Sequence, residues 1–218
     1  MQNITFFGQT DVGKLRQNNE DDFIAQYIWD KNHVLGVVID GLGGYEGGEI
    51  ATKIAKETII EHLEKPSKGE KLNLLKQVVV LANERIKKEQ LKDDPKLWQM
   101  GCVLSTCLVD VEKQQINMVH VGDTRVYELC DDGELLKLSH DHSFVGQLED
   151  TGELAGTEAM KHPDRNIIDR LLGHEYNISG EDYIQAETFP LLPNSTLLLC
   201  SDGLTDLVTK AEISAILN

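Results

Sequence analysis

The chain has 218 residues, 40% of them hydrophobic, and its 21 Lys and Arg residues face 37 Asp and Glu residues, a net charge of −16. That length suits one well-buried domain, so we expect a single domain over residues 1–218. The negative charge repels nucleic acid and anionic lipid, and no apolar stretch reaches the length of a membrane span. Residues 1–8 carry no secretory signal pattern, and we therefore expect a cytoplasmic monomer that binds neither nucleic acid nor membranes.

The first part of the chain predicts strands followed by helices. β-Prone runs at residues 4–10, 23–29 and 33–40 are separated by turn residues, which is typical of an antiparallel meander. Apolar residues then recur at helical spacing over residues 49–63 and 72–90. We therefore expect two helices that pack through one apolar face each.

The second part of the chain predicts another meander and a C-terminal helix. Its strands are expected at residues 103–111, 115–121, 126–130, 134–138, 184–189 and 196–200, and its helices at 143–151, 167–172 and 210–217. The polar stretch between residues 140 and 180 is expected to be mobile. Because strands and helices form separate runs, the order predicts an α+β fold with antiparallel sheets and outer helices.

Three of the predicted strands end in an aspartate beside a glycine. These pairs are Asp40-Gly41, Gly122-Asp123 and Asp202-Gly203. Each pair alone is more often a turn, but Mg²⁺ and Mn²⁺ prefer several carboxylate oxygens, and glycine lets a backbone approach a ligand closely. Three such ends together, with the acidic residues 20–22 near the first of them, favour a divalent-metal site.

One arginine stands beside this acidic cluster. Arg16 precedes Glu20 by four residues, and a guanidinium can bind a phosphate through two parallel hydrogen bonds while neighbouring acids hold a cation. An exposed salt bridge explains the same spacing equally well. The segment alone therefore leaves phosphate binding and a surface ion pair open.

A glycine-rich loop over residues 40–49 separates the third strand from the first helix. Glu46 stands where a dinucleotide-binding loop needs its last glycine, and the chain has no Gly-Lys-Ser/Thr sequence for a Walker loop. The acid at Asp40 lies where a phosphate would sit. We interpret this loop as part of a metal site and not of a nucleotide site.

The cysteines and the histidine pair predict no second metal site. Two histidines, His140 and His142, lie two residues apart without a nearby third ligand, which is more typical of a turn or a helix start. Cys102, Cys107, Cys130 and Cys200 lie in apolar runs without zinc spacing, and we expect reduced core residues.

Five blocks of residues, in this order, resemble the motifs of one family. They are Arg16-x-x-Asn19-Glu20-Asp21, residues 38–44 (Val-Ile-Asp-Gly-Leu-Gly-Gly), residues 121–125 (Val-Gly-Asp-Thr-Arg), residues 138–143 (Leu-Ser-His-Asp-His-Ser) and residues 200–206 (Cys-Ser-Asp-Gly-Leu-Thr-Asp). The family is the protein phosphatase 2C family of metal-dependent serine/threonine phosphatases, and the blocks resemble its bacterial branch most. The similarity runs from about Thr10 to the end of the chain.

This resemblance implies a four-layer αββα sandwich of two antiparallel sheets flanked by helices, with Mn²⁺ or Mg²⁺ in the channel between the edges of the sheets. Two core ions and a possible third, weaker ion are implied. Carried over by position, Asp40 bridges both core ions, Glu20 and the Gly41 carbonyl hold one of them, and Asp202 holds the other. Asp123 with Asp202 matches the position of the third ion. Asp21 and Asp206 lie just outside the ions, and Arg16 binds the phosphate. A flap is implied at about residues 143–159.

The implied reaction is hydrolysis of phosphomonoesters by metal-activated water, with Arg16 and Asp40 as the central catalytic residues. The implied substrate is a protein carrying phosphoserine or phosphothreonine, and a Ser/Thr kinase is the expected counterpart. The family pattern continues past Asn218 to a Gly-x-Asp-Asn segment, so we expect a C-terminally incomplete domain in which one ion has a carboxylate fewer. Two alternatives stay open: a weak or silent phosphatase-like domain that binds a phosphoprotein or regulatory partner, and a hydrolase of small phosphate esters.

Overall fold

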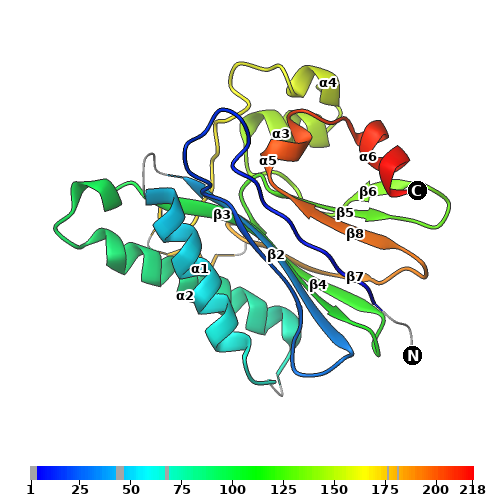
Figure 1. Cartoon of the computed structure of the whole chain (residues 1–218), viewed down its shortest axis with the longest axis horizontal. Helices are drawn as coiled ribbons and strands as arrows, with labels where there is room; N and C mark the ends of the chain where they lie inside the picture. Colours follow the sequence, from blue (N-terminus) through cyan, green and yellow to red (C-terminus); the bar gives the residue numbers. More distant parts are fainter. Residues whose placement is uncertain (1–3, 43–46, 67–68, 176, 181) are drawn as a thin grey trace.

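The computed structural model describes residues 4–42, 47–66, 69–175, 177–180 and 182–218. Two antiparallel sheets lie face to face between two layers of helices (Figure 1). The strand order is β1-β2-β3-β4-β7 in the five-stranded sheet and β6-β5-β8 in the three-stranded sheet. The predicted α+β sandwich is therefore confirmed.

The elements follow the expected chain order closely. The strands are β1 (Asp22–Tyr27), β2 (His33–Leu42), β3 (Gly101–Asp110), β4 (Gln115–Val121), β5 (Arg125–Leu129), β6 (Leu135–Lys137), β7 (Gln185–Pro190) and β8 (Thr196–Cys200). The helices are α1 (Gly47–Leu63), α2 (Lys71–Gln90), the 3-10 helix η1 (Pro95–Leu97), α3 (Phe144–Asp150), α4 (Gly156–Ala159), α5 (Asp202–Thr205) and α6 (Lys210–Leu217).

The central strand β3 is buried along its whole length, because it has apolar neighbours on both faces. Side chains alternate between the faces of a strand. Leu104 and Leu108 accordingly pack in the core beneath α1 and α2, whereas Cys107 and Val109 pack in the core between the sheets. This alternation explains why a mainly apolar run, buried on both of its faces, forms the middle of the sandwich.

Helices complete the outer layers on each side. Helices α1 and α2 pack against one another and cover β2 and β4, with buried Ile59 and Val79 in that core. On the opposite side, Ile213 of α6 packs with Tyr127 and Leu135 of the three-stranded sheet. Buried residues thus form three hydrophobic cores, which lie between the layers seen in Figure 1.

The chain passes from one sheet to the other between β4 and β5. The predicted second meander is therefore wrong in one respect, since β3 and β4 belong to the five-stranded sheet and β5 and β6 to the three-stranded sheet. Gly122 adopts φ +110° at the crossing, a backbone conformation that favours glycine. This turn brings Asp123 to the junction of the two sheets.

Two predicted elements do not form. Residues 4–10 are irregular, because their backbone joins no ladder of the described strands. Residues 167–172 form no helix, because isolated β-bridges join Ile168 to Ser143 and Leu172 to Cys102. Tertiary pairing outweighs the weak propensity of a six-residue helix, which carries a high nucleation cost.

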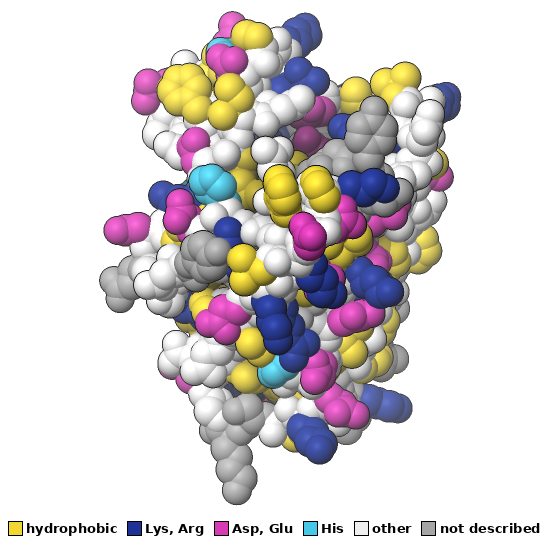
Figure 2. Space-filling view, turned by 90° about the vertical axis from the view of Figure 1, so that its left-hand side faces the viewer, with side chains coloured by type: hydrophobic (Ala, Val, Ile, Leu, Met, Phe, Trp, Pro, Cys, Tyr) yellow, Lys and Arg dark blue, Asp and Glu magenta, His cyan; other side chains and the backbone are white. Residues whose placement is uncertain are grey.

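The surface carries charges of both signs. Figure 2 shows acidic and basic side chains interspersed over the face on which α1 and α2 lie, so on that face the acidic excess is distributed. No helix in the described part of the chain is both long and apolar enough to cross a lipid bilayer.

Candidate metal centre

Asp40 lies near the end of β2 with its side chain between the two sheets. The alternation along β2 sends Leu35, Val37 and Ile39 to the helical side, and Val34 to the core between the sheets. Asp40 shares the face of Val34 by this period of two. The strand therefore carries its only acidic side chain towards the three-stranded sheet.

The acidic cluster at the start of β1 is divided between two environments. Asp22 faces the helices, where its Oδ1 atom lies 2.6 Å from Lys56 Nζ. The preceding Asp21 points the other way, where its Oδ2 atom accepts a hydrogen bond of 2.9 Å from Ser201 Oγ. Asp21 also lies near the carboxyl group of Asp40, whose pKa is raised by burial and then by the negative charge of Asp21. Asp21 therefore faces Ser201 and Asp40, whereas Asp22 forms a salt bridge on the helical side.

Close backbone packing brings Glu20 to the same place. A Cβ atom on Gly41 would lie 2.6 Å from the Gly48 carbonyl oxygen and 2.7 Å from that of Glu20. A Cβ atom on Gly48 would lie 2.9 Å from Glu20 Oε1. Thr52 Oγ1 donates a hydrogen bond of 2.8 Å to the Glu20 carbonyl oxygen and so fixes this segment. Glycine at position 41 lets the backbone of Glu20 and Gly48 come close, and glycine at position 48 leaves room for the Glu20 carboxylate. Residues 43–46 of the predicted glycine loop lie outside the described residues.

Two more acids come from the crossing between the sheets and from the end of the three-stranded sheet. Asp123 is 9% exposed and follows β4, and Asp202 begins α5 directly after β8. The pairing of Arg125 with Cys200 in the β5 and β8 ladder brings these two chain segments together. Asp206 lies one turn beyond Asp202.

All the predicted site residues line one groove. Its walls include Arg16, Glu20, Asp21, Asp40, Gly41, Asp123, Asp202 and Asp206. The structure thus brings together residues that are up to 190 positions apart in the sequence. In the described part of the chain, however, no three His, Cys, Asp or Glu side chains already form a closed metal-binding group. The carboxylates surround a common space without meeting in it.

The electrostatics of this space disfavour a set of bare carboxylates. Burial, and after it the negative charge of Asp21, raises the pKa of Asp40 to about 9. Burial and the charge of Asp202 raise the pKa of Asp123 to about 7. Burial also raises the pKa values of Asp202 and Glu20 above their usual range. Buried carboxylates that repel one another are stabilised by protons or by cations.

Arg16 stands on an exposed loop above the acids. Asn19 Nδ2 closes the base of this loop with a hydrogen bond of 2.8 Å to Thr10 Oγ1, and Gly13 N donates to Asp11 Oδ1 within it. The positive charge of Arg16 reaches two acids of the site, since it lowers the pKa of Glu20 and of Asp202 against the effect of burial. Arg16 is therefore close enough to act together with them.

Sequence reasoning assigned no role to Arg165, which also borders the site. Its Nε atom donates a hydrogen bond of 2.9 Å to Asp206 Oδ2, and it lines a cavity together with Asp123 and Asp202. A lone arginine in a polar stretch gives no sequence signal of this contact, which joins residues 41 positions apart.

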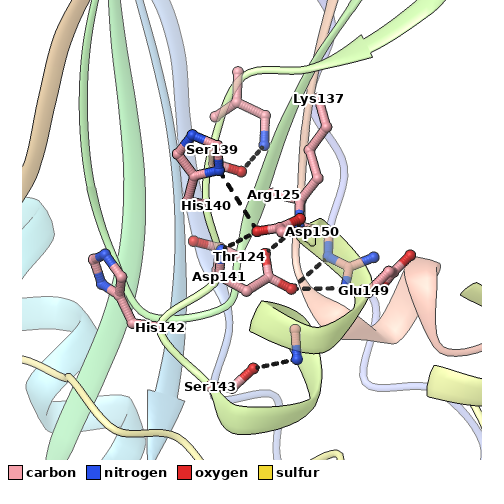
Figure 3. A network of polar contacts seen from close by, with 12 residues as sticks. Thr124, Arg125, Lys137, Ser139, His140, Asp141, His142, Ser143, Glu149 and Asp150 are labelled. Carbon is pink, nitrogen blue, oxygen red and sulfur yellow. Dashed lines mark hydrogen bonds and ion pairs between the residues drawn. The ribbon is translucent and has the colours of Figure 1, made fainter. Parts of the chain in front are cut away.

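A buried ion network, which sequence reasoning also missed, lines the same cavity through Arg125, Asp141 and Glu149 (Figure 3). Asp141 Oδ2 accepts hydrogen bonds from Arg125 Nε (2.9 Å) and Nη2 (2.6 Å). Asp141 Oδ1 lies 2.8 Å from Lys137 Nζ in an ion pair without hydrogen-bond geometry. Arg125 also binds Glu149 and Lys137 binds Asp150, so the network joins β5 and β6 to α3.

Most of these residues outside the site follow the sequence predictions, but the prediction of a core position is wrong for Cys130, which is only half-buried because it follows the end of β5, where the chain turns. Cys102, Cys107 and Cys200 are buried free thiols, and burial raises the pKa of Cys107 and of Cys200 to about 12. His142 lies just before α3 at a helix start, as expected, and His140 is exposed.

Comparison with known proteins identifies the family. The sequence profile of the family described as protein phosphatase 2C matches residues 14–218. The serine/threonine phosphatase Stp of Listeria welshimeri is 33% identical over 221 residues, which cover 96% of this chain and 81% of that protein. The crystal structure of the Mycobacterium tuberculosis serine/threonine phosphatase PstP has a TM-score of 0.80 and 32% identity, and the match covers 96% of this chain and 83% of that one.

A further solved structure contains metal. The catalytic domain of the phosphatase PstP in complex with two manganese ions has a TM-score of 0.78 and 30% identity, over 96% of this chain and 82% of that one. These similarities and the family profile agree with the five sequence blocks. The chain belongs to the protein phosphatase 2C family.

Proposed function

We propose that this chain hydrolyses phosphoserine and phosphothreonine in proteins by means of water activated by divalent cations. One observation carries the proposal: acids from both sheets line a single groove, beside an arginine, with raised pKa values at Asp40, Asp123 and Asp202. Oxygen donors of this kind fit Mn²⁺ or Mg²⁺. The manganese ions in the related PstP domain support the same choice.

The chain's own groups suit distinct positions around the ions. Asp40 would hold both core ions, Glu20 and the Gly41 carbonyl oxygen would hold one, and Asp202 the other. Asp123, with Asp202, would hold a third ion, while Asp21 and Asp206 would orient these ligands. When bound, the ions lower the pKa of a water molecule and supply a hydroxide nucleophile.

Arg16 would bind the phosphate. Its planar guanidinium can donate two parallel hydrogen bonds to phosphate oxygens, and the exposed loop leaves it accessible to a protein substrate. It would also stabilise the negative charge on these oxygens during hydrolysis. Arg16 and Asp40 are therefore the residues on which turnover depends most.

The names of the relatives support the substrate class. Proteins named serine/threonine phosphatase match 96% of this chain, which favours a phosphoprotein over a small phosphate ester. We propose that the chain acts as a monomeric domain over residues 1–218, with a flap at about residues 143–159. It would work in the cytoplasm against a Ser/Thr kinase.

The test is initial-rate hydrolysis of a phosphothreonine peptide and of p-nitrophenyl phosphate, with Mn²⁺ titrated and EDTA as control. We expect metal-dependent turnover of the peptide that EDTA abolishes. The matched variant Asp40→Asn should lose at least about 10³-fold in kcat, because it removes the shared ligand.

Three results would contradict parts of the proposal. Full turnover by the Asp40→Asn variant would refute the assigned ion site. Peptide binding without turnover would favour the silent domain. Hydrolysis of p-nitrophenyl phosphate alone would favour the small-ester enzyme.

A further inference from the structure

The peptide before Asp123 is held by an unusual set of contacts. Gly122 has φ +110°, and a Cβ atom there would lie 2.1 Å from Val103 Cγ1, so no other residue fits. Glycine has the widest conformational freedom of all residues. The direction in which the chain leaves Gly122 must therefore be fixed by contacts from outside the turn.

Two histidines supply these contacts. His142 Nδ1 accepts a hydrogen bond of 3.1 Å from Gly122 N, and His142 N donates one of 2.7 Å to Gly122 O. His120 Nε2 donates a second hydrogen bond, of 2.9 Å, to the same carbonyl oxygen. Both polar groups of this glycine are thus satisfied by the two histidines.

The residue after Asp123 is fixed as well. Thr124 is fully buried, and its Oγ1 atom lies 2.9 Å from Ser105 Oγ. Ser105 Oγ is in turn hydrogen bonded to His120 Nδ1 at 2.8 Å. Asp123 therefore stands between two anchored neighbours, and one buried hydrogen-bond network connects them.

Burial keeps the two rings in the form that this network needs. It lowers the pKa of His142 to about 3 and that of His120 to about 4, so both imidazoles are neutral at pH 7. Since Gly122 N is a donor, His142 Nδ1 must be the unprotonated nitrogen. The rings lie 5.0 Å apart between centroids, in a tilted contact.

The position of His142 depends on the ion network next to it. In Figure 3 its ring points away from the Arg125 and Asp141 contact, while its neighbour Ser143 caps α3 through a hydrogen bond from Gly146 N. Neighbouring side chains of this segment therefore have different partners, since Asp141 binds Arg125 of the ion network and His142 binds Gly122.

We propose that His142 is a positioning residue, which fixes the Asp123 carboxylate for cation binding through the hydrogen bond between Gly122 N and His142 Nδ1. This inference rests on the proposed function, in which Asp123 holds a cation. Asp123 must be held towards Asp202, which repels it, and a flexible glycine alone would let the two carboxylates move apart.

The test compares two substitutions of similar size. In His142→Asn, the amide oxygen can occupy the place of Nδ1 and accept the hydrogen bond; in His142→Leu, no acceptor remains. We expect His142→Leu to weaken the weakest Mn²⁺ site about tenfold or more in isothermal titration calorimetry, as outer ligand partners do. His142→Asn should stay within about threefold of the parent protein.

A double-mutant cycle separates this inference from the proposed function. If His142 acts through Asp123, then Asp123→Asn and His142→Leu together should weaken the site no more than Asp123→Asn alone. Normal Mn²⁺ binding by Asp123→Asn would refute Asp123 as a ligand and so the basis of the inference. The positioning role alone would be refuted if Asp123→Asn weakened Mn²⁺ binding while His142→Leu left it unchanged. It would also be refuted if the effects of the two substitutions on the Mn²⁺ affinity were additive. Melting temperatures without metal test for a general loss of fold. The Leu variant should melt about 2 to 12 °C below the Asn variant, because Gly122 N is left without an acceptor, but both should be folded at the temperature of the titration. A Leu variant that is unfolded at that temperature would contradict the proposal.

Discussion

The Asp141→Asn substitution offers a strong test of the buried ion network. It removes the charge of a carboxylate that is 3% exposed and leaves the size of the side chain unchanged. Breaking a buried ion pair from one side costs about 3 to 5 kcal/mol, because the partner charges stay buried. Arg125 keeps Glu149 at 2.7 Å and Lys137 keeps Asp150 at 2.6 Å, so we expect the lower end, about 3 kcal/mol.

This loss should be visible as a change in melting temperature. For a chain of this size, each kcal/mol lowers the melting temperature by about 2 to 4 °C, so the variant should melt about 6 to 12 °C lower at pH 7. Glu149→Gln is the control: Glu149 is 25% exposed, and its loss should cost about 1 kcal/mol or less. Differential scanning calorimetry measures both. A decrease below about 2 °C for Asp141→Asn would refute the reasoning.

The same variant has a defined pH dependence. Burial alone would raise the pKa of Asp141, but Lys137 and Arg125 outweigh it and hold the pKa below its usual value of 3.8. A lowered pKa stabilises the fold above the pKa of the unfolded chain, and this stabilisation is lost as the pH falls through the folded value. The difference between parent and variant should therefore be complete above pH 5 and shrink below pH 4.

Three further predictions concern the site. The raised pKa values of Asp40 and Asp123 stabilise the metal-free fold below about pH 4, and this stabilisation is lost as the pH rises towards 7 and 9. Because Mn²⁺ displaces the protons of these carboxyl groups, the gain in melting temperature on adding Mn²⁺ should grow between pH 6 and 8. A gain that does not change with pH would contradict this prediction. Gly48→Ala should push the Glu20 carboxylate aside and weaken Mn²⁺ binding about tenfold in calorimetry. The control Gly36→Ala, whose Cβ would meet only Leu199 at 3.7 Å, should bind Mn²⁺ like the parent protein. Equal Mn²⁺ affinities of the two variants would show that Gly48 does not make room for the Glu20 carboxylate. Arg16→Met should lower kcat/KM for a phosphopeptide about 10²-fold with unchanged Mn²⁺ affinity, and a loss confined to the Mn²⁺ affinity would exclude phosphate binding.

The sequence predicted most of the elements because their apolar periods coincide with burial on one or two faces. Strand β4 begins and ends where expected, and α1 and α2 agree within two residues. The prediction of a strand at residues 4–10 is wrong because residue preference is not sufficient. A strand also needs a neighbouring strand to complete its backbone hydrogen bonds. Local pattern therefore determines whether a segment suits a strand, and pairing determines whether one forms.

Asp40, Asp123 and Asp202 could be chosen from the sequence because each stands beside a glycine at the end of a predicted strand, whereas the roles of Glu20, Asp21 and Asp206 came from the family resemblance. The residues that support these acids could not be chosen from the sequence. The contacts of His142 with Gly122 and of Arg165 with Asp206 join residues 20 and 41 positions apart, and depend on how the sheets cross. His142 was predicted only as part of a helix start, since a buried imidazole that accepts a backbone hydrogen bond leaves no mark in residue spacing.

The distribution of the acids over both sheets has a mechanical consequence. Asp40 belongs to the five-stranded sheet, and Asp202 directly follows β8 of the three-stranded sheet. A cation shared by them would therefore act as a brace across the sandwich and resist sliding of one sheet over the other. Conversely, any shift of one sheet relative to the other would separate Asp40 from Asp202, so the affinity for the cation would depend on the alignment of the two sheets.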